Sequence, residues 1–141
     1  FKDTVNRLKK RGIRVCVHII NGLPNETRED MMQTVKELNK LGIDGVKIHL
    51  LHVLNDTPLY NYYKQGKLRL LEEEEYVEIV VDQLEILSKN IVVQRLTGDA
   101  PRNKLVGPMW STNKKVILNR IDKMLKERNS CQGSQVEKVL E

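Results

Sequence analysis

The sequence has few cysteines, few aromatic residues and no long apolar run. Its two cysteines, Cys16 and Cys131, lie far apart in an apolar and a polar stretch, which argues against a structural disulfide and favours a reducing, cytoplasmic setting. No apolar run approaches the ~20 residues that span a bilayer, and the charged N-terminus is unlike a signal peptide, so no membrane partner is expected. With one Trp and one Phe, the core must consist mainly of Val, Ile and Leu, which suits buried parallel strands.

Several catalytic and ligand-binding motifs are also absent. The turn at 22–24 is not followed by Gly-Lys-Ser/Thr, which excludes a phosphate loop of that type. There is no CxxC spacing, and alternation places His49 and His52 on opposite faces of a predicted strand, so Cys16, His18, His49 and His52 do not form a standard zinc site. No motif places a partner beside Cys16 for nucleophilic catalysis. We therefore assign no catalytic residue and expect no metal ligands in this chain.

The net charge of +5 is unevenly distributed. Residues 1–14 carry six basic and one acidic side chain, and residues 91–128 carry nine basic and three acidic. Residues 67–90 are instead acidic, with seven acidic and three basic side chains. Basic ends are typical of proteins that bind nucleic acid or phosphate, although solvated helix faces are the simpler explanation. The basic residues are not interleaved with an aromatic platform, so the signal for nucleic acid is weak.

Helical and strand-like segments alternate along the chain. A helix capped by Asn25 or Thr27, with Asp30 as the capping-box partner, is expected to end at Gly42. The order α-β-α-β-α-α-β-α predicts right-handed crossovers and a parallel sheet. Further helices are expected over 2–11, 59–65, 71–89 and 112–128, strands over 14–20, 45–53 and 91–97, and a loop over 98–111.

Three strands make a narrow sheet with two unpaired edges, which invite missing strands or a second copy of the chain. The chain begins at Phe1, within a predicted helix and without Met, so we expect a fragment of a longer protein. Residues 1–128 are expected to form the folded part. Residues 129–141 have the composition of a polar, flexible tail.

Side-chain alternation predicts that one face of each strand is apolar and the other carries polar groups. The polar face holds His18, Lys47, His49 and Arg95, which line one surface if the strands are parallel neighbours. Burying these groups is costly unless an anion compensates them. Two explanations stay open: a pocket for a carboxylate, phosphate or nucleic-acid backbone, or neutralisation by carboxylates from a missing part of the protein.

Three segments resemble the radical S-adenosylmethionine (SAM) enzymes. HIINGLPNET is similar to a strand, Gly-Leu-Pro turn and helix late in their partial (β/α) barrel, GVKIHLLHVLNDTPLYNYYKQGK to the next strand and loop, and IVVQRLTGDAP to a strand downstream. Together they resemble the C-terminal half of a bacterial family related to the catalytic subunit of Elongator and to methylthiotransferases. The resemblance spans about residues 1–128 and implies half of a TIM-like radical SAM barrel, with about three parallel strands and flanking helices.

The resemblance also implies a SAM site at the carboxyl ends of two strands. The cationic residues His18, Lys47, His49 and Arg95 would then face the carboxylate of SAM or the substrate. The positions that match the family's adenine- and ribose-contacting segments are Ile20, Asn21, Gly22, Leu23, Pro24, Leu51, His52 and Val53.

The cysteine content departs from the family pattern. Radical SAM enzymes hold a 4Fe–4S cluster with a three-cysteine loop, and this chain has no such triplet. The resemblance therefore predicts an enzyme fragment that is inactive alone, whose longer parent binds SAM and a 4Fe–4S cluster and generates a 5′-deoxyadenosyl radical. The expected partners are the missing N-terminal half of the barrel, a second copy through exposed strand edges, and RNA. The alternative is a stand-alone basic α/β module that binds nucleic acid or a phosphorylated partner.

Overall fold

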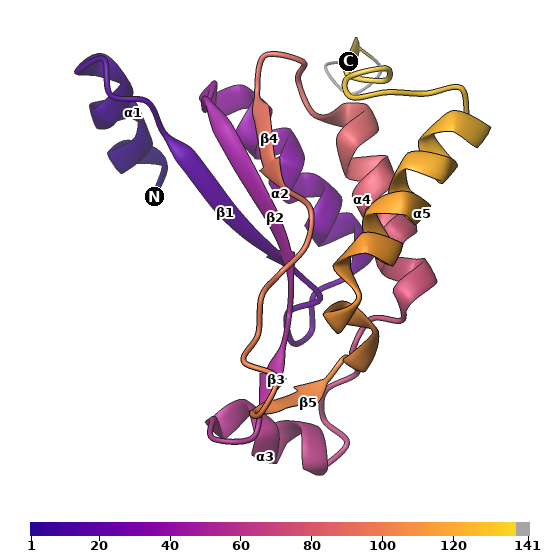
Figure 1. The fold of residues 1–141 in the computed structure, drawn as a ribbon. Helices are drawn as coiled ribbons and strands as arrows, with labels where there is room; N and C mark the ends of the chain where they lie inside the picture. The colour runs from indigo at the N-terminus through magenta and orange to yellow at the C-terminus, as the bar shows by residue number, and fades with distance from the viewer. Residues whose placement is uncertain (138–141) are drawn as a thin grey trace.

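The computed structural model describes residues 1–137, in which helices pack against one face of a parallel sheet (Figure 1). The elements follow each other nearly in the predicted order. They are α1 (Lys2–Lys10), β1 (Cys16–Asn21), α2 (Arg28–Leu41), β2 (Gly45–Leu50), β3 (Val53–Leu54), α3 (Pro58–Lys64), α4 (Glu73–Ile86), β4 (Val92–Arg95), β5 (Leu105–Gly107), the 3-10 helix η1 (Met109–Thr112) and α5 (Lys114–Glu127).

The main sheet has three parallel strands in the order β1-β2-β4. Its register pairs His18 with Lys47 and Ile20 with His49, and Lys47 in turn with Arg95 beyond a local irregularity. This arrangement confirms the predicted α/β class, with three parallel strands and flanking helices. The sheet does not close into a barrel within residues 1–137, where β1 and β4 each have a single neighbour.

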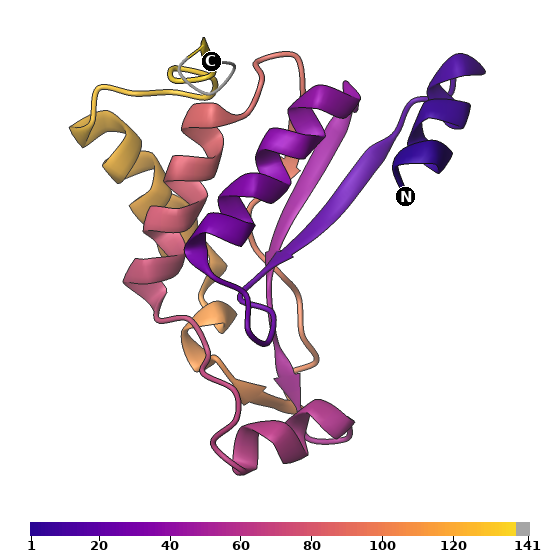
Figure 2. The same cartoon turned by 180° about the vertical axis from the view of Figure 1, so that it is seen from behind.

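A second, two-stranded sheet was not predicted. The expected strand over 45–53 ends at Leu50, and Val53 begins β3, which pairs antiparallel with β5. The expected loop over 98–111 therefore contains β5 and η1. In both figures, β3, β5 and α3 lie together beyond the carboxyl ends of β1 and β2 (Figures 1 and 2).

The helix boundaries follow from local capping. Thr27 is the N-cap of α2, and the Thr27 hydroxyl and the Asp30 carboxylate bond reciprocally to each other's backbone N–H, which confirms the predicted capping box. The helix ends at Gly42, which has a left-handed φ of 58°. The same motif begins α4, where Glu72 pairs with Glu75.

The apolar core lies between the sheet and the layer of α2, α4 and α5. Figure 2 shows α2 and α4 side by side in front of the sheet, and α5 packs against α4. The three helices have 14 residues each, and none of the helices in residues 1–137 could cross a membrane. The sheet contributes a buried row of alternating residues to this core, namely Val17, Ile19, Val46, Ile48 and Leu50.

Residues 129–137 contact the end of α4. The Gly133 N–H donates to the carbonyl of Leu84 at 2.9 Å, and the Gln135 N–H donates to that of Glu85 at 2.8 Å. The Gln132 side chain also donates to the carbonyls of Ser88 and Ile91. Composition predicted a flexible tail over 129–141, and its flexibility stays a prediction, but 129–137 has defined contacts that composition did not indicate. Residues 138–141 lie outside the described residues.

Candidate functional site

The turn after β1 is built around Gly22, which has a left-handed φ of 84°. A Cβ atom here would lie 2.9 Å from Cγ of Leu71, so a larger residue would be strained and would displace its neighbour. The N–H groups of Gly22 and Leu23 both donate to one carboxylate oxygen of Glu26, at 2.9 and 3.0 Å. Glu26 therefore fixes the shape of the turn, a role that its position in the sequence did not indicate.

The residue before the turn, Asn21, points into the helix layer. Its side chain is 2% exposed and exchanges two hydrogen bonds of 2.9 Å with Gln83 of α4. Gln83 also donates to the carbonyl of Met31 at 3.2 Å. The side-chain amide of Asn21 is thus committed to anchoring the turn.

The predicted SAM-contacting positions divide into exposed and buried side chains. Ile20 and Leu23 are each 43% exposed, and Leu51 is half-buried beside them at the end of β2. The Leu51 N–H donates to the carbonyl of Asn21 at 3.0 Å, which joins the carboxyl ends of β1 and β2. The Val53 side chain is fully buried. An apolar ligand surface is therefore available at Ile20, Leu23 and Leu51.

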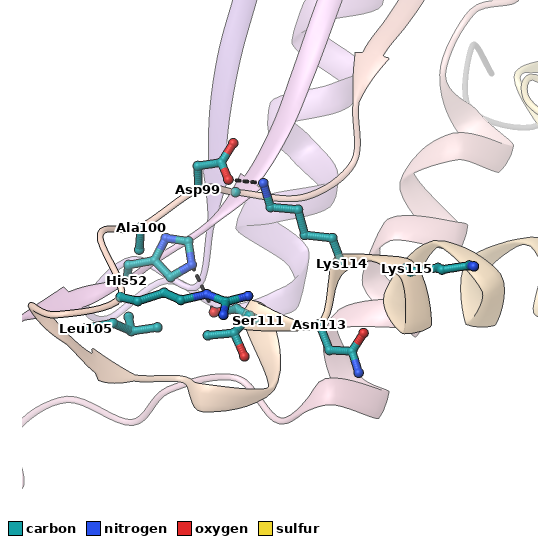
Figure 3. A pocket seen from close by; sticks show the side chains of 11 residues that line it. His52, Asp99, Ala100, Leu105, Ser111, Asn113, Lys114 and Lys115 are labelled. Carbon is teal, nitrogen blue, oxygen red and sulfur yellow. Dashed lines mark hydrogen bonds and ion pairs between the residues drawn. The ribbon is translucent and has the colours of Figure 1, made fainter.

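His52 lines a cavity of about 390 Å³ between the ends of β2 and β4 and the start of α5 (Figure 3). Its Nε2 lies 3.1 Å from Oγ of Ser111, and that hydroxyl donates its single proton to the carbonyl of Pro108 at 2.6 Å. His52 must therefore carry its proton on Nε2, which leaves Nδ1 as an acceptor. A Cβ atom at position 98 would lie 2.6 Å from the ring, so Gly98 makes room for this histidine.

The cavity is lined by charged groups of both signs. Asp99 forms ion pairs with Lys114 and, at 3.2 Å, with Arg95. Arg102 and Lys115 also line the cavity (Figure 3). Burial first, then the charges of His49 and Lys114, lower the pKa of His52 below its usual 6.5. The imidazole is thus neutral at pH 7 and suited to hydrogen bonding.

The four polar-face residues His18, Lys47, His49 and Arg95, here called the cationic cluster, come together. Alternation accounts for the three residues of β1 and β2, whereas Arg95 pairs with Lys47 only because the register of β4 shifts after Val93, which alternation did not predict. The strand register places His18, Lys47 and Arg95 in one row across the three strands. The rings of His18 and His49 stack with centroids 5.5 Å apart and an interplanar angle of 17°. Burial first, then the charges of His18, Arg95 and Lys47, lower the pKa of His49.

The residues present do not fit an iron–sulfur cluster. Cys16 lies in β1 and Cys131 beyond the end of α5, and both are exposed free thiols. No group of three or more His, Cys, Asp or Glu side chains in residues 1–137 is arranged to hold a metal ion. This chain therefore does not supply the set of thiolates that a 4Fe–4S cluster requires.

The sequence pattern missed most of the cavity around His52. Its lining residues Asp99, Arg102 and Ser111 lie in the segment expected to be a plain loop. The Gly98-Asp99 pair directly after the expected strand over 91–97 was the available signal, because ligands of parallel α/β folds bind beyond the carboxyl ends of strands.

Known proteins resemble this chain over most of its length. YtqA of Bacillus subtilis is 50% identical over 133 residues, which cover 94% of this chain and 41% of YtqA. A tRNA uridine(34) acetyltransferase of Methanocaldococcus jannaschii is 29% identical over 118 residues, or 79% of this chain and 22% of that protein. The chain thus spans less than half of the length of these relatives.

A solved structure and a family model agree with these relatives. The archaeal Methanocaldococcus infernus Elp3 with an N-terminal deletion matches 92% of this chain and 32% of its own with a TM-score of 0.75 and 25% identity. The model of the radical SAM C-terminal domain matches residues 43–127, more than half of the chain. We conclude that this chain belongs to the radical SAM C-terminal domain family.

Proposed function

We propose that this chain is the C-terminal half of the barrel of a radical SAM iron–sulfur enzyme, within a longer protein that binds SAM and a 4Fe–4S cluster. The observation that carries the proposal is the open face of the sheet. Its carboxyl edge has the Gly22 turn and apolar side chains, and its surface has the cationic cluster. Family membership is consistent with this use of the face.

The chain's own residues suit the binding of SAM but not of the cluster. The Gly22 turn, packed against Leu71, sets the position of the strand end, and Ile20, Leu23 and Leu51 offer apolar contact for an adenine ring. Pro24 and His52 complete this proposed surface, whereas Asn21 and Val53 are buried and support it from below. SAM bound to a reduced 4Fe–4S cluster is the source of a 5′-deoxyadenosyl radical, and the cluster's cysteines would lie in the remaining part of the longer protein.

The remaining part of the barrel is the first proposed partner. The outer edge of β1 has no strand neighbour within residues 1–137, so its backbone groups are available to a further parallel strand. Self-association through the same edge is the expected behaviour of the chain when it is separated from that partner.

The substrate that we propose is RNA, specifically a tRNA. The support is similarity to the tRNA uridine(34) acetyltransferase and the basic charge of residues 1–14 and 91–128. Because fold similarity does not fix a substrate, this part of the proposal rests on analogy.

The test uses the longer protein that contains this chain, reconstituted with iron and sulfide without oxygen. Calorimetry measures SAM affinity, and chromatography measures 5′-deoxyadenosine after reduction. Gly22→Val should abolish SAM binding, because the side chain would strain the turn and meet Leu71. Gly66→Val is the matched control, since Gly66 has a similar φ of 70° and no atom within 4 Å of the added Cβ.

Two results would contradict the proposal. The first is unchanged SAM affinity in Gly22→Val while the protein stays folded by circular dichroism. The second is a stoichiometric 4Fe–4S absorbance spectrum from this chain alone, since its two cysteines are too few to hold the cluster.

A further inference from the structure

The cationic cluster lacks compensating negative charge. Within residues 1–137, no carboxylate bonds to His18, Lys47 or His49, and only Arg95 has an acidic partner, Asp99 at 3.2 Å. Adjacent parallel strands are about 4.8 Å apart, so the row formed by His18, Lys47 and Arg95 concentrates positive charge on a narrow strip. Such a strip raises the free energy of the protein unless an anion binds to it.

One atom of the cluster is also left without a hydrogen-bond partner. Nε2 of His49 is buried and is the only buried side-chain nitrogen or oxygen in the described chain with no partner. An unpaired buried polar atom costs stability, and such atoms are often explained by a ligand. The unpaired nitrogen and the uncompensated charges lie in the same cluster.

The cluster extends along the sheet away from the turn where we propose that SAM binds, because His49 pairs with Ile20 near the turn and His18 lies further back. His18 precedes Gly22 by four residues, which is about 13 Å along an extended strand. The same face of the sheet is open in this structure, where His18 is exposed and Lys47 and His49 are only partly buried. The cluster can therefore bind a group that is separate from the adenosine part of SAM.

We infer that the cationic cluster binds an oxyanion of the substrate, a phosphate or a carboxylate, through Lys47, Arg95 and the His18–His49 pair. The inference rests on the proposed function only in assuming that a substrate exists. The anion site itself is inferred from the geometry of the cluster. Lys47 lies at the centre of the row and contributes most, because its neighbours on both sides are cationic and it has no acidic partner among the described residues.

The experiment titrates the longer protein with inorganic phosphate, acetate and chloride at constant ionic strength. Calorimetry gives the affinities, and the imidazole resonances of His18 and His49, assigned with His→Gln variants, report the place of binding.

Lys47→Met keeps the apolar stem and should weaken oxyanion binding about tenfold or more, as expected for loss of a charged hydrogen-bond donor. Lys123→Met is the matched control, because Lys123 lies on α5 in the helix layer and its side chain is 76% exposed. His18→Gln, at an exposed position, is the second variant should Lys47→Met fold poorly.

Each outcome decides a point. Tighter binding of phosphate than acetate supports a phosphoryl substrate, and the reverse supports a carboxylate. Absence of binding in a protein that still binds SAM overturns the inference, as does equal weakening by Lys47→Met and Lys123→Met. Displacement of the oxyanion by SAM also overturns it, because the cluster would then hold the carboxylate of SAM. If the unsubstituted longer protein does not bind SAM, that result would instead count against the proposed function.

Discussion

The two faces of the parallel sheet have opposite character although they share the same three strands. The face toward α2 and α4 is mostly apolar, and its residues Val17, Ile19, Val46, Ile48 and Leu50 are 9% exposed or less. The other face carries His18, Lys47 and His49 and is not covered by any helix within residues 1–137 (Figures 1 and 2). Successive side chains of a strand point to opposite faces, so adjacent residues in one strand serve stability and ligand binding separately. Substitutions at neighbouring positions should therefore have very different effects.

The largest effect is expected on the covered face. Ile48 in the central strand is 0% exposed, so Ile48→Ala removes buried methyl groups and leaves a cavity. We expect a loss of about 2–5 kcal/mol in the free energy of unfolding, measured by urea denaturation. Val92→Ala is the control, since Val92 is 62% exposed on the same sheet and should change stability by only about 0.5 kcal/mol. Similar losses in both variants would contradict the contrast between the faces.

An intermediate effect on the free energy of unfolding is expected at the buried polar pair on the covered face. Asn21 and Gln83 are buried there and satisfy each other's amide groups. Gln83→Leu would leave the Asn21 amide unpaired and should cost about 1–3 kcal/mol by the same denaturation assay. The double variant Asn21→Leu with Gln83→Leu should recover part of this loss, because no unpaired side-chain amide remains. A double variant whose loss equals the sum of the single losses would contradict the pairing.

The pattern of the sheet was predictable from sequence because alternation is a strong local signal. It placed His18 and Lys47 on one surface, and the register of the strands confirms this. Arg95 joins them through a register irregularity in β4 that the sequence pattern did not indicate. The same parity puts Asn21 with Val17 and Ile19, on the covered face, where its side chain is found. The assignment of Asn21 to a cofactor site came from family resemblance and stays a prediction for its backbone.

The cavity around His52 was not predictable in the same way. The strands β3 and β5 have two and three residues, too few for alternation to be recognised. Ser111 reaches His52 only because β5 and η1 fold back across 59 residues of sequence. Such long-range contacts depend on how the elements pack, whereas capping boxes such as Thr27 with Asp30 lie within one helical turn and were found directly.

The smallest predicted effect is on how the free energy of unfolding depends on pH, through His49 on the open face. Burial and the neighbouring charges of His18, Arg95 and Lys47 lower the pKa of His49 in the folded chain, and His52 lies near it as well. The unfolded state, with a histidine pKa of about 6.5, then binds more protons, so stability should fall as the pH falls below that value. Unfolding at pH 7.5 and 5.5 should show a smaller loss in His49→Gln than in the unsubstituted chain. An equal loss in both would mean that the cationic cluster does not raise the cost of protonating His49.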